Sequence, residues 1–383
     1  MKKRILSLVA LILCGMGVLC IPVSAQSPVN TEDLYREQSA ASGAEELWKT
    51  LPEETRRLLK AMGLEGLDSE TYTALQPGTV LEEIVGVFSE QAGGVAAVCG
   101  ALLGAVFLGA LAEGARQTVQ EPKMAETFSV LCAAAIAGTI LLPVSECVGQ
   151  ACEAARSVSV FMLSFVPAYG AVLVSSGQAT MALSYSTVLL TGAECVSALT
   201  TDVVTPLLTV SLGVGGIGAL TEKNRLSALG GLLNKLAGWL LATATALFSA
   251  MLSFQSVVAS SADSLGQRAA KMSIGAFVPV VGGPLSEAFG TVTGCLRLLR
   301  STLGAFGAVA AVGLILPAVC RCAAWALALA VGKAAAEALG VRPAAALAGA
   351  AQGVIKTLIG VLAASGLFMI VTTTVVTMAG GGS

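Results

Sequence analysis

Residues 93–112 read GGVAAVCGALLGAVFLGALA, a continuous apolar run without a charged residue. A helix of about 20 such residues spans the hydrocarbon core of a bilayer. With this run, the candidate spans lie at about 93–112, 126–146, 157–176, 180–197, 203–220, 236–258, 272–292, 301–319, 322–339 and 357–379. The sequence therefore predicts an all-α, polytopic membrane protein with about ten transmembrane helices, within a range of 8–10, in residues 91–383.

The composition excludes several classes of protein. Only 12% of the residues are charged, whereas soluble globular domains contain about 25%. The formal net charge of −2 gives no reason to expect a nucleic-acid partner. Histidine is absent, which removes the commonest general base, the commonest metal ligand and every Ser-His or Cys-His nucleophile pair. We therefore expect no enzyme, no metal site and no cofactor, and we expect membrane lipid as a partner.

Residues 1–25 have the three parts of a signal peptide. Residues 2–4 are basic, residues 5–20 are apolar, and small residues precede a cleavage point after Ala25. Two alternatives stay open, a lipoprotein signal acylated at Cys20 and an uncleaved anchor. In each case the chain from residue 26 onward starts outside the cytoplasm.

We predict that residues 26–90 form a small extracytoplasmic helical segment. They include 13 acidic and 5 basic residues. Pro52 suits the first turn of a helix, and Leu58, Leu59 and Met62 would share one face of that helix. Thr79 to Glu82 match a capping box that would open a second helix leading into the membrane. The alternative is a partly ordered tail.

Basic residues at the span ends predict the orientation. With an external start, four bases beyond the exported segment fall outside: Arg156, Arg268, Lys271 and Arg321. Ten fall in the cytoplasm: Arg116, Lys123, Lys223, Arg225, Lys235, Arg297, Arg300, Lys333, Arg342 and Lys356. This bias fits the positive-inside rule. If 157–197 and 272–296 were re-entrant hairpins instead, six bases would lie inside and eight outside. The bias therefore favours ten spans.

A six-residue sequence recurs within the chain in similar form, and such internal echoes are found in transporters. Phe165 to Gly170 read FVPAYG, and Phe277 to Gly282 read FVPVVG. Paired repeats with Pro/Gly-interrupted helices build the central site of many transporters. Chance similarity among Ala/Gly/Val-rich helices explains the echo about as well, so a secondary transporter is one hypothesis among others.

Gly213 to Gly218 match G-x-G-x-x-G, the pattern of a dinucleotide site. Such a site needs a strand before the glycines and an acidic residue about 20 positions later. Here an apolar span comes first and Trp239 stands near the acidic position. We therefore interpret these glycines as small residues at which two helices pack closely.

One stretch combines a helix break with polar groups at membrane depth. Pro279 and the following Gly282, Gly283 and Pro284 would interrupt the seventh span, and freed carbonyl groups need polar partners there. Glu287 and Gln255 are the polar groups predicted to lie close enough, so Gln255, Pro279, Gly282, Gly283, Pro284 and Glu287 form the candidate functional centre. The alternative is an interhelical hydrogen bond without further function.

Cys147 and Cys152 flank a stretch predicted to be an external loop. A disulfide between them is conceivable in an oxidising compartment. If the stretch were helical, the five-residue separation would point the two thiols to different faces.

The stretch 248–295 resembles a known family. It reads FSAMLSFQSVVASSADSLGQRAAKMSIGAFVPVVGGPLSEAFGTVTGC. Ser253 to Gln255, Ala259 to Asp263, Arg268 to Lys271 and Phe277 to Ser286 resemble the stage III sporulation protein AE family of endospore-forming Firmicutes. The signal peptide, the exported segment and the multi-span remainder agree with the layout of that family.

This resemblance implies a membrane subunit of the sporulation channel apparatus between mother cell and forespore. It places the subunit in the mother-cell membrane that surrounds the forespore. The implied partners are other subunits of the same stage III operon, including a secretion-type ATPase and ring-forming proteins, and a forespore membrane partner. The family is regarded as permease-like, and the resemblance carries over no catalytic or binding residues.

Overall fold

The computed structural model describes residues 31–64, 66, 77–116, 122–220, 224–277 and 282–379, and all regular structure in these residues is helical. Three short helices come first: α2 (Thr31–Ala41), α3 (Ala44–Thr50) and α4 (Glu53–Ala61). The long helices are α6 (Pro77–Arg116), α7 (Pro122–Ser175), α8 (Ala179–Ala198), α9 (Thr205–Leu220), α10 (Asn224–Phe277), α11 (Gly282–Ala338) and α12 (Arg342–Ala379). A π-helical turn, η1 (Leu199–Val204), joins α8 to α9. The all-α prediction is confirmed for the described residues.

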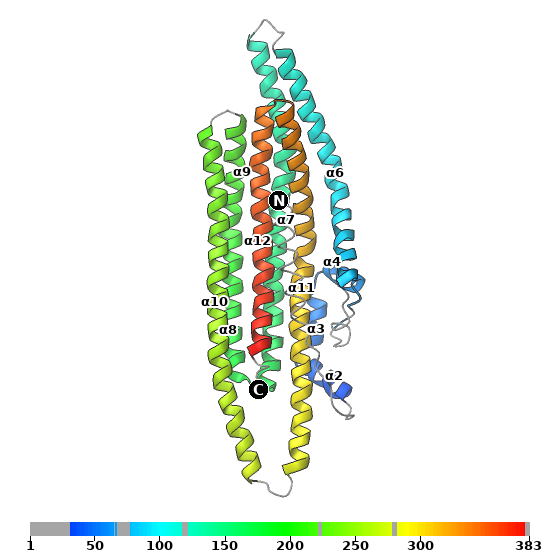
Figure 1. Ribbon diagram of the computed structural model, residues 1–383, viewed down its shortest axis with the longest axis vertical. Helices are drawn as coiled ribbons and strands as arrows, with labels where there is room; N and C mark the ends of the chain where they lie inside the picture. Colours follow the sequence, from blue (N-terminus) through cyan, green and yellow to red (C-terminus); the bar gives the residue numbers. More distant parts are fainter. Residues whose placement is uncertain are drawn as a thin grey trace.

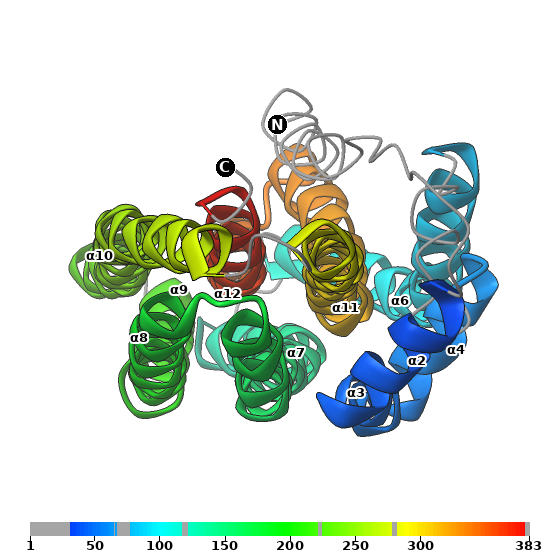
Figure 2. The same ribbon diagram turned by 90° about the horizontal axis from the view of Figure 1, so that it is seen from below.

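The long helices lie side by side in one elongated bundle (Figure 1). At one end α6 meets α7, α9 meets α10 and α11 meets α12; we call this the α11–α12 end, after Ala338 and Arg342. At the opposite end α7 meets α8 and α10 meets α11; we call this the α10–α11 end, after Phe277 and Gly282. Figure 2, which looks along the bundle, shows α12 between α10 and α11. Apart from α8 and α9, which η1 joins into one continuous helix, each long helix therefore runs antiparallel to the next one along the chain.

Helix α12 is the central helix of the bundle. It contacts α7, α9, α10 and α11. Ile355, Leu358 and Leu362 on it are fully buried, and their spacing puts them on one face of the helix. A row of aromatic rings fills the core beside it: Phe165 stacks on Tyr169 with ring centroids 5.5 Å apart, and Tyr169 lies 5.3 Å from Tyr185 of α8. The bundle is therefore held by a continuous apolar core.

Helices α2 to α4 are docked on the outside of this bundle, against α7 and α11. The rings of Trp48 and Phe306 lie 6.2 Å apart between centroids. A β-carbon at Gly313 would lie 3.0 Å from the Cγ2 of Thr55, so α4 approaches α11 where that side chain is missing. The prediction of a helix after Pro52 is confirmed, and the three residues expected on one face, Leu58, Leu59 and Met62, are all buried. The second predicted helix begins at Pro77 instead of at the capping box, because proline suits a first helical position.

The prediction of ten spans is wrong. In the described residues, six helices are long and apolar enough to cross a membrane: α6, α7, the continuous α8–η1–α9, α10, α11 and α12. The predicted pairs 126–146 with 157–176 and 301–319 with 322–339 each fall on one unbroken helix. Hydropathy in a 20-residue window marks an apolar stretch, but it does not say whether the helix ends between two stretches.

The stretch between Cys147 and Cys152 shows why these helices continue. Apart from one glycine it lacks turn-forming residues, and it lies within α7. Both cysteines are free thiols, so the disulfide is not formed. The Sγ of Cys152 instead lies 2.7 Å from the Oγ1 of Thr205. The helical alternative for this stretch is therefore the one that the structure adopts.

Two of the ten bases assigned to the cytoplasmic side lie toward the other end of the bundle. Arg297 and Arg300 were expected on the cytoplasmic side, but both lie in the part of α11 nearer the α10–α11 end. Arg300 is buried and donates a hydrogen bond of 2.9 Å to Gln178, which precedes α8. Arg116, Lys123 and Arg225 lie at helix ends at the α11–α12 end of the bundle. Their common position agrees with the prediction that all three lie on the same side of the membrane.

The structure decides both the internal echo and the G-x-G-x-x-G match. Phe165 to Gly170 lie inside α7, whereas Phe277 and Gly282 are the last residue of α10 and the first of α11, so the echo is no structural repeat. The interpretation of Gly213 to Gly218 as packing residues is confirmed at Gly215 and Gly216, whereas nothing lies within 4 Å of a β-carbon at Gly213. A β-carbon at Gly215 would lie 3.0 Å from the Cβ of Ala350 on α12.

Candidate functional site

The predicted centre falls around the start of α11. Gly282 and Gly283 are its first two residues, and Pro284 and Glu287 lie in its first two turns. The first four N–H groups of a helix have no intrahelical acceptor, so Pro284 removes no helical hydrogen bond there. Pro284 is therefore part of a helix start, and the predicted seventh span is divided between the end of α10 at Phe277 and the start of α11 at Gly282. Pro279 lies outside the described residues.

Gln255 belongs to the same predicted centre but lies at another level of the bundle. It is half-buried in α10, about 33 Å along the helix before the end at Phe277. Glu287 lies only about 8 Å into α11. The two helices diverge from their shared end and run antiparallel (Figure 1). The structure therefore does not bring Gln255 to the level of Glu287.

A polar bridge that the sequence did not predict joins three helices. Arg321 of α11 donates from Nε to the Oε1 of Gln91 on α6, at 2.9 Å. Its Nη1 donates to the Oε1 of Gln150 on α7. A guanidinium group can serve two amide acceptors at once because its donors form a planar fork. Arg321 had been expected in an external loop, so sequence reasoning had no cause to pair it with glutamines.

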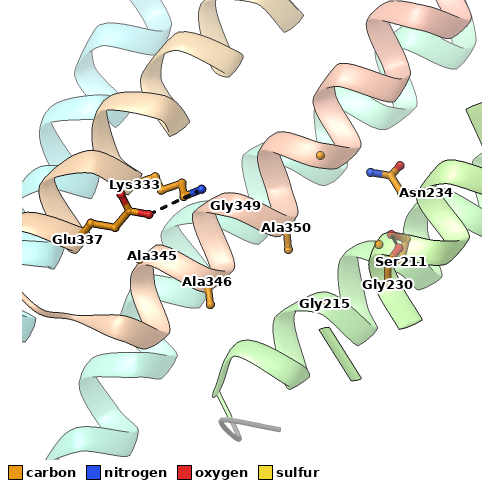
Figure 3. A pocket seen from close by; sticks show the side chains of 12 residues that line it. Ser211, Gly215, Gly230, Asn234, Lys333, Glu337, Ala345, Ala346, Gly349 and Ala350 are labelled. Atoms are coloured by element: carbon orange, nitrogen blue, oxygen red, sulfur yellow. Dashed lines mark hydrogen bonds and ion pairs between the residues drawn. The ribbon is translucent and has the colours of Figure 1, made fainter. Parts of the chain in front are cut away.

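The structure also contains a cavity of about 410 Å³ between α9, α10, α11 and α12 (Figure 3). Lys333 and Glu337 of α11 line it and form an ion pair with 3.7 Å between Nζ and Oε1. On the opposite side, the Oγ of Ser211 donates to the carbonyl oxygen of Gly230 at 2.7 Å. The Oδ1 of Asn234 is buried there without a hydrogen-bond partner. The cavity thus offers a cation, a carboxylate and an unused acceptor.

The wall that α12 contributes consists of small residues. A β-carbon at Gly353 would lie 2.9 Å from the Nδ2 of Asn234, and one at Gly349 would lie 3.8 Å from the Nζ of Lys333. Lys333 and Asn234 therefore flank a single turn of α12, and Figure 3 shows them on its two sides. This arrangement could hold a small polar solute that carries both an acceptor and a donor group.

Sequence reasoning missed this cavity. It treated Lys333 only as a cytoplasmic base, although the i, i+4 spacing to Glu337 predicts a pair on a helix. Nothing local relates either residue to Asn234, which is about 100 positions away in the chain. Within the described part of the chain, no three Cys, Asp or Glu side chains are grouped so that they could hold a metal ion.

Comparison with known proteins decides the family. A sequence profile described as stage III sporulation protein AE matches residues 67–380. The chain belongs to the stage III sporulation protein AE family. The match contains every long helix of the bundle, but not the short helices α2 to α4, and it includes the predicted centre and the cavity. The resemblance seen in 248–295 is thereby confirmed.

A curated relative supports the same assignment. Stage III sporulation protein AE of Bacillus subtilis (strain 168) is 31% identical over 160 residues, which is 42% of this chain and 40% of the relative. The alignment thus spans less than half the length of that relative. No solved structure matches the chain.

Proposed function

We propose that this member of the stage III sporulation protein AE family is an integral membrane subunit of a channel or secretion-like apparatus that links mother cell and forespore and is required for forespore development. The observation that carries the proposal is the family match over residues 67–380. Six helices with the length and apolarity of membrane spans support a membrane location. The channel itself rests on the resemblance of 248–295 to the family.

The proposed partners are the other stage III sporulation proteins, including a secretion-type ATPase, ring-forming proteins and a forespore membrane partner. Exposed apolar side chains support an assembled state. Leu183, Leu247 and Phe254 are 69%, 70% and 73% exposed on the neighbouring helices α8 and α10. Large exposed apolar surfaces are covered by lipid or by other protein chains.

The proposed location is the mother-cell membrane around the forespore, with the segment before α6 outside the cytoplasm. Arg116, Lys123, Arg225 and Arg342 belong to helix ends at the α11–α12 end of the bundle. A cytoplasmic position for this end follows the positive-inside rule. Labelling of single cysteines placed at Arg116 and Arg225 tests it, because an impermeant thiol reagent should modify neither in intact cells.

A secondary transporter is the second candidate, and the cavity between α9 and α12 favours it. Ionisable groups at membrane depth face cavities and mark solute or ion pathways. Lys333 and Glu337 line the cavity within two turns of the end of α11, so this cavity would be the mouth of such a pathway. Both candidates involve a membrane protein without an enzymatic role.

Sporulation assays with cavity variants separate the two candidates. Lys333→Met removes the cation, and Gly353→Leu displaces Asn234, because a β-carbon at Gly353 would already lie 2.9 Å from its Nδ2. Lys356→Met, at an exposed lysine of α12 outside the cavity, is the matched control. A subunit that acts through its partners should support full sporulation with either cavity variant at normal accumulation. Loss of sporulation by both, with the control intact, would instead favour transport and call for a flux measurement.

A further inference from the structure

The bundle is much longer than a bilayer is thick. Helices α7 and α10 have 54 residues each and α11 has 57, so each is more than about 80 Å long. The hydrocarbon core of a bilayer is about 30 Å thick. Lipid can therefore surround only part of the bundle, and the structure indicates which part.

The docked helices α2 to α4 mark a region that lies in water. Their exposed charged residues are Glu37, Glu46, Lys49, Glu53, Glu54, Arg57 and Lys60. A charged side chain at the centre of a bilayer costs about 2.5–3.5 kcal/mol on insertion scales. The sum over such a set is far larger than the stability of a small helical segment. These helices therefore lie outside the hydrocarbon core.

Their docking position divides α11 into two halves. Helix α4 packs at Gly313, which lies about 38 Å from the α11–α12 end. Figure 1 shows α3 and α2 following from there toward the α10–α11 end, and α2 contacts α11. The charged surface of α2 to α4 thus borders the half of α11 between Gly313 and Gly282. The other half is long enough for one crossing of the hydrocarbon core.

Helix α6 is suited to one crossing in that other half. Its residues 91–112 contain no charged side chain and are about 33 Å long, which suits one crossing. They pack at the α11–α12 end: a β-carbon at Gly332 of α11 would lie 2.5 Å from the Cδ2 of Leu102, and one at Gly109 would lie 3.5 Å from the Cγ1 of Val341. The part of α6 nearer its start carries Glu82, Glu83 and Glu90.

We propose that the bilayer encloses only the half of the bundle toward the α11–α12 end, and that the half toward the α10–α11 end, with α2 to α4 docked on it, projects into water. The acyl chains of the lipid cover the outer surface of the half toward the α11–α12 end. The proposal concerns membrane depth and does not depend on the sporulation role.

Two positions on α10 make a matched test. Leu232 and Phe254 are both exposed and apolar, and they lie about 33 Å apart along the helix, one in each half. Leu232→Cys and Phe254→Cys are made in a chain whose other cysteines are replaced by alanine, labelled with bimane and placed in nanodiscs. Discs of brominated phosphatidylcholine are compared with discs of the unbrominated lipid, because bromine quenches a fluorophore that touches the acyl chains.

The expected result is strong quenching at Leu232→Cys and none at Phe254→Cys. Quenching at Phe254→Cys, alone or together with Leu232→Cys, would overturn the proposal, and so would the absence of quenching at both. Circular dichroism of each labelled variant, compared with the unsubstituted chain, verifies that the helices are intact before the fluorescence is compared.

Discussion

Truncation of Leu59 should release helix α4 from α11. Leu59 is fully buried, and its Cδ2 lies 3.5 Å from the position of a β-carbon at Gly313. Replacing a buried leucine by alanine costs about 2–5 kcal/mol, because apolar contact is lost and a cavity is left. Even the lower value changes the ratio of docked to released segment about 30-fold, since 1.4 kcal/mol is a factor of ten.

Hydrogen exchange followed by mass spectrometry measures this release in nanodiscs. Peptides that cover α4 should exchange at least about 30-fold faster in Leu59→Ala, while peptides from the core of α12 keep their protection. The matched control is Lys60→Ala, which changes the exposed neighbour on the same helix. If α4 exchanged at the same rate in both variants, the segment would not be held by the contact with α11, and its use as a marker of depth would fail.

Three further predictions concern processing, the predicted centre and helix packing. The mature chain should begin after Ala25, and N-terminal sequencing of the membrane-purified protein would contradict this by finding the initiator methionine. Glu287→Gln and Gln255→Ala should each accumulate normally yet stall forespore development; full sporulation by both would leave only a packing role for that stretch. Gly230→Leu should lower the melting temperature by an amount that corresponds to about 1–3 kcal/mol, because a β-carbon there would lie 3.0 Å from a backbone oxygen of α9. Gly231→Leu, where nothing lies within 4 Å, should change it little, and equal shifts would refute the close contact.

The sequence was informative wherever a local rule decides the structure. Pro52 predicted the start of α4, and the missing strand before Gly213 indicated that the glycine pattern is not a dinucleotide site. Both features depend only on residues that are close to one another in the sequence. The span count failed at Cys147 to Cys152 because a helix continues through any stretch that offers no turn, whatever its hydropathy.

The candidate sites were harder to predict because they depend on distant residues. Gln255 and Glu287 are 32 positions apart in the sequence, yet the helical rise separates their levels in the bundle. The contacts of Arg321 with Gln91 and Gln150, and the approach of Asn234 to Gly353, arise only when α6, α7 and α10 pack on their neighbours. Composition likewise cannot say whether lipid or protein covers an apolar helix face.

Whether lipid or protein covers an apolar face of α10 leads to a prediction about assembly. This prediction rests on the proposed membrane depth. If the half toward the α10–α11 end projects into water, its exposed apolar side chains, such as Phe254, need protein to cover them. Phe254→Glu should then leave membrane insertion and accumulation of the lone chain unchanged and reduce its self-association, measured by mass photometry of the purified protein. In sporulating cells the same variant should weaken co-isolation of the partner subunits.

Leu232→Glu is the matched control in the other half. There the carboxylate meets acyl chains, and charged residues at that depth cost about 2.5–3.5 kcal/mol on insertion scales, so accumulation in the membrane should fall sharply. The two variants add the same charge to the same helix and differ only in depth. Equal loss of accumulation would mean that lipid covers both positions, and the need for a protein partner at Phe254 would disappear. A loss confined to Leu232→Glu is the pattern required of a subunit that is anchored by one half and assembled through the other.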